Sequence, residues 1–245
     1  MNNITIIIPC FNEEKRLKYK DFIDFSNNNK INFFFINDGS SDGTKEVIEK
    51  ILSKTQNNSL LNLDYNVGKA EAIRIGMLKA IKKFDSNIFG YWDADLATPL
   101  SEIIYLLKYF KTDETVMVFG SRFKRLGNNI QRNAIRHYFG RIIATFISMI
   151  LNMGVYDTQC GAKIINKKFI KEIFTQPFYT KWLFDVEIFF RIKQFTKEKK
   201  IIEIPLNTWS DIANSKITIL DFAKTPFNLL KIILKYRFNK NYFNK

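Results

Sequence analysis

Asp93 and Asp95 are separated by one residue and directly follow the apolar run 88–92. If that run forms a buried strand, both carboxylates lie at the same edge of a sheet. Two hard oxygen ligands in that position suit a divalent cation whose remaining ligands are diphosphate oxygens, which is the chemistry of enzymes that use nucleotide sugars. A strand end followed by an Asp-rich turn explains the same residues without any chemical role, so this interpretation needs support from further motifs.

Two other apolar runs, 4–8 and 33–36, also end in polar residues. Ligands of open α/β sheets bind at the C-terminal ends of the strands, because loops there gather backbone N–H groups and side chains around one crevice. We therefore expect Asp38 to bond to a base or ribose, and Asn12 and Glu13 to orient a nucleotide.

The arginines favour a phosphate-bearing ligand. Arg122 follows another apolar run, and Arg132, Arg136 and Arg141 are spaced four or five residues apart, which places them on one side of a helix. A solvated basic face explains the same spacing. The segment continues into an apolar run that ends at Leu151, so cationic and apolar surface occur together, as expected where a protein meets a lipid phosphate at an anionic membrane.

The C-terminal stretch 217–238 repeats this combination of cationic and apolar residues. Packing against a core is the alternative explanation for its apolar side. Lys216, just before this stretch, is placed to reach a donor or acceptor phosphate.

The chain has 245 residues and a formal net charge of +14. This length suffices for one α/β domain with a full core, and no linker, repeat or low-complexity tract divides it. The charge favours phosphate-bearing substrates or an anionic membrane surface as partners. Because no zinc-ligand spacing or recognition-helix pattern is present, nucleic acid is the least favoured partner.

Features of the termini and cysteines bear on location. Cys10 and Cys160 form no CxxC pair, which indicates a reduced compartment. The first strand begins too close to Met1 to leave room for a signal peptide. No apolar run reaches the roughly 20 residues that span a bilayer. We expect a cytoplasmic protein that is peripheral to the cytoplasmic face of the membrane.

Strand-like and helix-like segments alternate through the first half of the chain, which is typical of an α/β fold with a mostly parallel sheet covered by helices. The predicted strands lie near residues 4–8, 33–37, 60–64, 88–92, 116–120 and 201–205. The predicted helices lie near residues 13–27, 43–54, 69–83, 100–110, 133–152, 167–174, 184–195 and 218–236.

These motifs together resemble a known family, the family-2 glycosyltransferases with the single-domain GT-A fold. The segments that carry the resemblance are 8–14, 37–44, 93–95 and 120–122. The resemblance implies a nucleotide-sugar-dependent hexosyltransferase that works by one in-line displacement with inversion. It implies a GT-A domain over residues 1–216, with 217–245 as an amphipathic helical extension of the same domain.

A narrower resemblance is to the dolichyl-phosphate β-glucosyltransferases, and it rests on segments 93–99, 157–163 and 182–187. It implies transfer of glucose from UDP-glucose to a polyprenyl phosphate. The chain departs from this branch at Ala70 and Ala162, where Gly and Phe are usual, and it lacks the N-terminal membrane anchor of the eukaryotic members.

Because of these departures, donor chemistry carries over better than acceptor identity. The alternative is a family-2 enzyme that adds a sugar to a hydroxyl of a cell-surface glycan or its lipid-linked precursor. A nucleotide-sugar binding protein with a degenerate site is the non-enzyme alternative, which the intact aspartate pair disfavours.

The resemblance also implies residue roles. Asp93 and Asp95 hold Mg²⁺ or Mn²⁺; alternatively Asp93 bonds to ribose or sugar hydroxyls and Asp95 holds the metal alone. The residues expected to bind the donor are Pro9, Asn12, Glu13, Asp38, Lys69, Asp93 and Arg122. Those expected at the acceptor phosphate are Arg132, Arg136, Lys163 and Lys216.

Two aspartates are candidates for a general base, and the acceptor decides whether one is needed. A sugar hydroxyl must lose a proton during attack, so a carboxylate within reach contributes roughly 10²–10⁴-fold. A phosphate monoester, with a second pKa of about 6, is already anionic at neutral pH. Asp157 and Asp185 are the candidates, and the resemblance favours Asp157. Asp185 is alternatively a carboxylate that stabilises a helix N-terminus.

Overall fold

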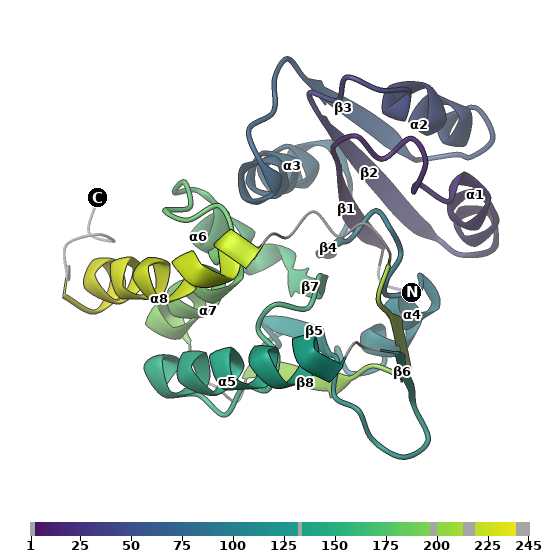
Figure 1. Cartoon of the computed structure of the whole chain (residues 1–245). Coiled ribbons are helices and arrows are strands. Elements are labelled where there is room, and N and C mark those ends of the chain that lie inside the picture. Colours follow the sequence, from purple (N-terminus) through teal and green to yellow (C-terminus); the bar gives the residue numbers. More distant parts are fainter. Residues whose placement is uncertain (1–2, 132–133, 197–199, 213–218, 239–245) are drawn as a thin grey trace.

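The computed structural model describes residues 3–131, 134–196, 200–212 and 219–238. Their core is a seven-stranded sheet with the strand order β3-β2-β1-β4-β7-β5-β8 (Figure 1). Its strands are β1 (Ile4–Cys10), β2 (Ile31–Asp38), β3 (Ser59–Leu63), β4 (Ile88–Trp92), β5 (Met117–Ser121), β7 (Ala162–Asn166) and β8 (Ile201–Pro205). A separate two-stranded sheet pairs β6 (Asn129–Gln131) with β9 (Thr208–Ser210).

Helices cover both faces of the sheet because its strands are apolar on both sides. In β1, Ile7 packs into one core while Ile6 and Ile8 pack into the other. One face carries α1 (Tyr19–Asn28), α2 (Thr44–Leu52) and α4 (Ser101–Leu107). The other face carries α3 (Lys69–Lys83), α5 (Ala134–Leu151), the short η1 (Lys167–Phe169), α6 (Ile170–Phe174), α7 (Phe184–Phe195) and α8 (Ile219–Ile233), which continues as the π-helical η3 (Leu234–Phe238).

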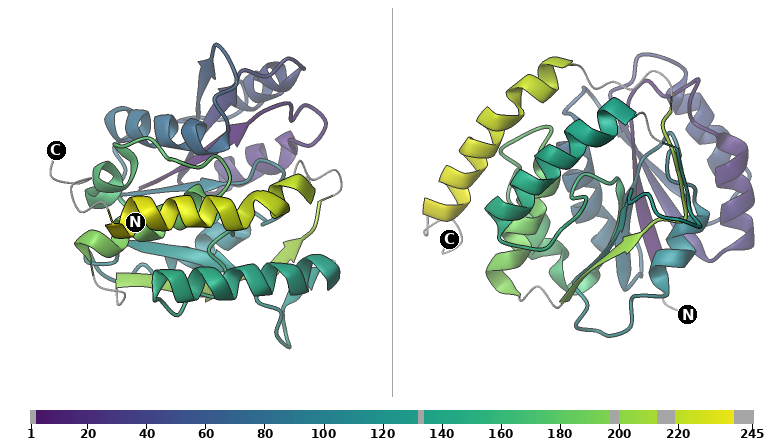
Figure 2. Two further views of the ribbon diagram at one scale, coloured as in Figure 1. Left: turned by 60° about the vertical axis from the view of Figure 1, so that its left-hand side comes forward. Right: turned by 60° about the horizontal axis from the view of Figure 1, so that its bottom comes forward.

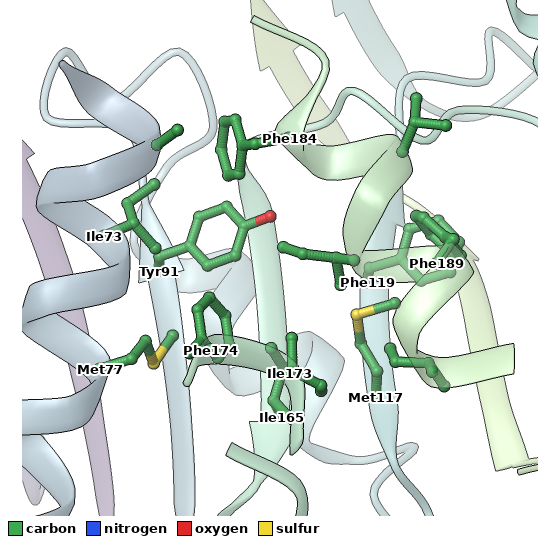
Figure 3. Packing of buried hydrophobic residues seen from close by; sticks show 14 of the residues in the cluster. Ile73, Met77, Tyr91, Met117, Phe119, Ile165, Ile173, Phe174, Phe184 and Phe189 are labelled. Carbon is green, nitrogen blue, oxygen red and sulfur yellow. The ribbon is translucent and has the colours of Figure 1, made fainter. Parts of the chain in front are cut away.

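The core beneath α3, α6 and α7 is rich in aromatic side chains (Figure 3). Tyr91 of β4 and Phe184 of α7 have ring centroids 6.0 Å apart, and Phe119 of β5 meets Phe189 of α7 edge-on at 5.1 Å. Aromatic pairs add about 0.5–1.5 kcal/mol each to the burial of their area. These contacts hold the first turns of α7 against β4 and β5.

Helices α5 and α8 lie side by side on one side of the molecule (Figure 2). Each has a buried face, which includes Ile147 and Leu151 of α5 and Leu229 and Ile232 of α8. Within the described ranges, no helix has both the length and the apolar character needed to cross a bilayer.

The strand directions bring three distant segments to one edge of the sheet. Strands β1, β2 and β4 are parallel, so their C-terminal loops share that edge. Strand β7 runs antiparallel between β4 and β5, and pairs Ala162 with Trp92. The segment that precedes β7 therefore lies beside Asp93, and the end of β5 at Arg122 lies on its other side.

The predicted α/β fold with a mostly parallel sheet is confirmed, with three differences. Strand β7 was not predicted, because Lys163 interrupts its apolar pattern; the structure buries that charge beside Asp185. The three-residue strands β6 and β9 were also missed. Helix α1 begins at Tyr19 rather than near residue 13. Glu13 and Glu14 are held instead against the start of α2, where the Glu13 N–H donates to Thr44 and the Glu14 N–H donates to Asp42.

Candidate active site

A cleft of about 600 Å³ opens at the C-terminal edge of β1, β2 and β4. Its walls are formed by the loops after these strands, the end of β5, the segment before β7, the start of α7, and residues of α5 and α8. Of the predicted site residues, nine line the cleft, and eight of them are Pro9, Glu13, Asp38, Lys69, Asp93, Asp95, Arg122 and Asp157. Asp185, at the start of α7, lines it as well.

The carboxylate pair at the end of β4 carries unbalanced negative charge. Asp93 accepts a hydrogen bond from the Lys69 ammonium at 2.5 Å. Burial opposes ionisation of Asp93, but Lys69 outweighs this effect and holds the pKa of the Asp93 carboxyl below its ordinary value. Asp95 accepts the Ala97 N–H at 3.1 Å, and no ion pair between described residues includes it. Burial is the larger cause that raises the pKa of Asp95, and the negative charge of Asp93 is the second. A cation bound between the two carboxylates would relieve the repulsion between them.

These two carboxylates fit a divalent metal that shares its coordination with a ligand. Among the described residues, no group of three or more His, Cys, Asp or Glu side chains is placed to hold a metal ion. Asp93 and Asp95 alone would leave most positions of Mg²⁺ or Mn²⁺ to other oxygens. Two carboxylate ligands therefore suit a metal ion that binds together with a diphosphate, whose oxygens complete its coordination.

The loops after β1 and β2 are fastened to each other. Asn12 has a positive φ of 50° and accepts the Ser41 N–H on its side-chain oxygen at 2.9 Å. Glu13 forms an ion pair with Arg16. Asp38 accepts the backbone N–H groups of Val67 and Gly68 at 2.8 and 2.9 Å, so it anchors the loop that leads to Lys69.

Arg122 and Asp157 form a clamp on the opposite side of the cleft. The Arg122 Nε and Nη2 groups donate to the two carboxylate oxygens of Asp157 at 2.6 and 2.8 Å, and the Arg122 backbone N–H donates to it at 3.1 Å. Burial disfavours the charged guanidinium, but Asp157 outweighs this effect and raises the pKa of Arg122. The clamp fixes a permanent cation at the cleft wall.

Asp185 belongs to a buried group of three side chains. It accepts hydrogen bonds from the Lys163 ammonium at 2.6 Å and from the Tyr91 hydroxyl. Lys163 also donates to the Cys160 carbonyl oxygen at 2.6 Å and is fully buried. The prediction that Lys163 binds an acceptor phosphate is therefore corrected: its ammonium is used within the fold, below the cleft.

Other predicted acceptor residues lie outside what the structure describes. Arg132 and Lys216 are not among the described residues, and the Arg136 side chain is likewise outside them. Three further cationic residues line the cleft: Arg16, which pairs with Glu13, Arg141 of α5, and Lys181. Arg141 stacks on Tyr156 at 3.4 Å and donates to its carbonyl oxygen at 2.7 Å.

Three acidic residues that position loops around the cleft were not identified from the sequence. Each accepts two successive backbone N–H groups at 2.7–3.2 Å: Glu203 from Tyr156 and Asp157, Glu102 from Asn207 and Thr208, and Glu187 from Tyr179 and Thr180. The only sequence signal is an acidic residue within an apolar strand or helix. These contacts preorganise the cleft, because they hold its loops in place before a ligand binds.

A mostly parallel sheet of this order, with a carboxylate pair at the end of its central strand and a cleft above it, matches the GT-A fold of glycosyltransferases. The family model described as "Glycosyl transferase family 2" matches residues 5–174. The chain belongs to glycosyl transferase family 2 and is a glycosyltransferase.

Proteins with similar sequences include several dolichyl-phosphate β-glucosyltransferases. One such enzyme from Trichomonas vaginalis is 31% identical, over 96% of this chain and 74% of the relative. Another from Saccharomyces cerevisiae is 28% identical, over 95% of this chain and 75% of the relative. An uncharacterised protein of Methanocaldococcus jannaschii is 31% identical, over 93% of this chain and 97% of the relative.

Solved structures support the fold. Glucosyl-3-phosphoglycerate synthase from Mycobacterium tuberculosis, crystallised with Mn²⁺, UDP and phosphoglyceric acid, matches with a TM-score of 0.71 and 14% identity, over 96% of this chain and 78% of that one. At this identity the match establishes the GT-A arrangement and nothing finer.

Proposed function

We propose that the protein transfers glucose, with inversion, from UDP-glucose to a polyprenyl phosphate of the dolichyl-phosphate type, at the cytoplasmic face of a membrane. This is the reaction that gives the similar dolichyl-phosphate β-glucosyltransferases their name. In this chain the proposal rests on one observation. Each of the two candidate bases already forms an ion pair with a basic side chain, Asp157 with Arg122 and Asp185 with Lys163.

The donor half of the proposal rests on Asp93 and Asp95. Mg²⁺ or Mn²⁺ bound there would stabilise the charge that develops on the departing diphosphate. Lys69 adds a second positive charge beside Asp93, and Asp38 holds the loop that presents Lys69. The partly buried site strengthens these interactions because little water competes with them.

The acceptor half rests on the state of the two candidate bases. Both carboxylate oxygens of Asp157 are bound by Arg122, and one oxygen of Asp185 receives both Lys163 and Tyr91. A sugar hydroxyl would need one of them to accept its proton. A phosphate acceptor needs charge neutralisation instead, because it is already an anion at neutral pH. Asp157 uses two of the five N–H donors of the Arg122 guanidinium, and the others can donate to a phosphate, so the geometry favours a phosphate over a hydroxyl.

Exposed apolar side chains beside the cleft support a lipid acceptor. On α5, Tyr138, Ile142, Phe146 and Met149 recur every three or four residues and are 55–70% exposed. On the neighbouring α8 and its continuation η3, Phe227, Leu230 and Leu234 are 52–59% exposed, with Lys231 and Lys235 among them. Other residues of both helices, including Ile143 and Thr225, line the cleft. An apolar face with interspersed lysines beside a phosphate-binding cleft suits a lipid phosphate in an anionic bilayer.

The direct test is transfer of label from UDP-[¹⁴C]glucose to a polyprenyl phosphate in anionic vesicles with Mg²⁺. Wild type and an Asp24→Asn variant, altered on the exposed side of α1, should form an organic-extractable product, and Asp95→Asn should not. Absence of any lipid-linked product with every common nucleotide sugar would refute the acceptor assignment.

A further inference from the structure

Two neighbouring residues in the cleft wall each carry a buried polar side-chain atom that has no hydrogen-bond partner among the described residues. In the part of the chain that the structure describes, the buried side-chain atoms without a partner are Oγ1 of Thr158 and Nε2 of Gln159, and no others. Both residues line the cleft, and Thr158 is only 2% exposed. Buried polar groups in native proteins are almost always paired. Two consecutive orphaned groups in one cleft wall therefore point to a ligand that pairs with them.

The position of these groups indicates which part of a ligand they face. Gly161, two residues after Gln159, packs so closely on Asp93 that a Cβ atom there would lie 2.0 Å from its Oδ2. Asp157, one residue before Thr158, holds Arg122. The orphaned pair therefore belongs to a cleft-lining segment that contacts the proposed metal ligand Asp93 after the pair and holds Arg122 before it.

The segment that carries the pair is held rigidly by its own contacts. Glu203 accepts the Asp157 N–H at 2.8 Å, Asp157 accepts the Gln159 N–H at 3.2 Å, and Lys163 binds the Cys160 carbonyl oxygen. The backbone is therefore fixed while the two side-chain groups stay unpaired. Such an arrangement is typical of a preorganised binding site.

The chemistry of the pair suits a neutral, hydroxyl-bearing ligand. An amide N–H only donates, whereas a threonine hydroxyl both donates and accepts, and a sugar hydroxyl complements either. Phosphate oxygens are bound preferentially by guanidinium and ammonium groups, which the neighbouring Arg122 and Lys69 provide. We propose that Thr158 and Gln159 bind hydroxyl groups of the transferred hexose and set the selectivity for its epimer. This inference rests on the proposed function and names the part of that site that recognises the sugar.

The test compares UDP-glucose with UDP, which lacks the hexose. Dissociation constants of both ligands are measured by titration calorimetry with Mn²⁺ for wild type, Thr158→Val and Gln159→Leu. Loss of one hydrogen bond to a hydroxyl should weaken UDP-glucose binding about tenfold, with UDP binding unchanged within about twofold. Thr158→Ser, which keeps the hydroxyl, should bind UDP-glucose in preference to UDP by the same factor as wild type.

Matched controls and deoxy analogues complete the experiment. Thr5→Val removes a buried hydroxyl that pairs with Ser86 far from the cleft, and Gln194→Leu alters an exposed amide on α7; neither should change the UDP-glucose to UDP ratio. A mono-deoxy UDP-glucose that lacks the contacted hydroxyl should bind the corresponding variant and wild type equally.

Two results would overturn the inference while leaving the proposed function intact. One is a ratio of UDP-glucose affinity to UDP affinity in Thr158→Val and Gln159→Leu that equals the wild-type ratio. The other is an equal loss of UDP and UDP-glucose affinity, which would mean that the residues only shape the fold. If wild type itself neither binds nor transfers a nucleotide sugar, the proposed function fails and the inference fails with it.

Discussion

The buried Lys163–Asp185 pair allows the structural and chemical roles of Asp185 to be separated. Lys163→Met keeps the length of the side chain but removes its charge, leaving the Asp185 carboxylate with the Tyr91 hydroxyl alone. Asp185→Asn leaves the Lys163 ammonium, which is fully buried, with the Cys160 carbonyl and an amide. Breaking a buried pair by removing one partner costs about 3–5 kcal/mol, so each single variant should lose that much stability.

The double variant Lys163→Met/Asp185→Asn removes both charges together. No unpaired charge then remains in the core, so we expect its free energy of unfolding to lie closer to that of wild type than does that of either single variant. A general base contributes roughly 10²–10⁴-fold to the rate. If Asp185 only fixes the start of α7, the double variant should keep kcat within about tenfold of wild type.

Urea denaturation of all four proteins gives the stabilities, and transfer of label from UDP-glucose gives kcat on the same preparations. A double variant that is as stable as wild type but more than about 100-fold slower would identify Asp185 as a base and refute the argument for a phosphate acceptor. A Lys163→Met variant as stable as wild type would refute the buried ion pair itself.

Three further predictions address the cation site, the thiols and the membrane face. Lys69→Met removes an ammonium that competes for Asp93, so Mn²⁺ affinity without nucleotide, followed by electron paramagnetic resonance, should rise about two- to fivefold; a fall would contradict the competition. Burial, together with the charge of Asp157, raises the pKa of the Cys160 thiol to about 12, so only about one thiol in 10⁴ is ionised at pH 8. Iodoacetamide should therefore leave native Cys160 unmodified and label it in urea; rapid native labelling would contradict its burial. Phe146→Asp should weaken sedimentation with anionic vesicles by about tenfold or more without lowering the melting temperature, whereas unchanged sedimentation would exclude α5 from the membrane contact.

The sequence was informative where chemistry follows directly from a strand end. Asp38, Asp93 and Arg122 each come just after an apolar run, and parallel strands then bring such ends to one edge of the sheet. Their placement in a common cleft was therefore predictable from local pattern and general rules of α/β folds.

The partners of these residues were not predictable, because they depend on contacts between distant segments. Asp157 is 35 residues from Arg122, and Lys163 is 22 residues from Asp185. Both pairs form because the unpredicted strand β7 enters the sheet antiparallel between β4 and β5. Lys163 consequently became part of the core instead of the acceptor site. Glu203 could not be identified as a loop anchor for the same reason.

The central claim is that Asp95 and Asp93 bind a donor diphosphate through a divalent metal. Calorimetric titration of UDP with and without Mn²⁺ tests it most directly, on wild type, Asp95→Asn and the control Asp24→Asn. We expect Mn²⁺ to strengthen UDP binding about tenfold or more in wild type and Asp24→Asn, and to have no effect in Asp95→Asn. Equal UDP affinity with and without Mn²⁺ in wild type, or a full Mn²⁺ effect in Asp95→Asn, would contradict it.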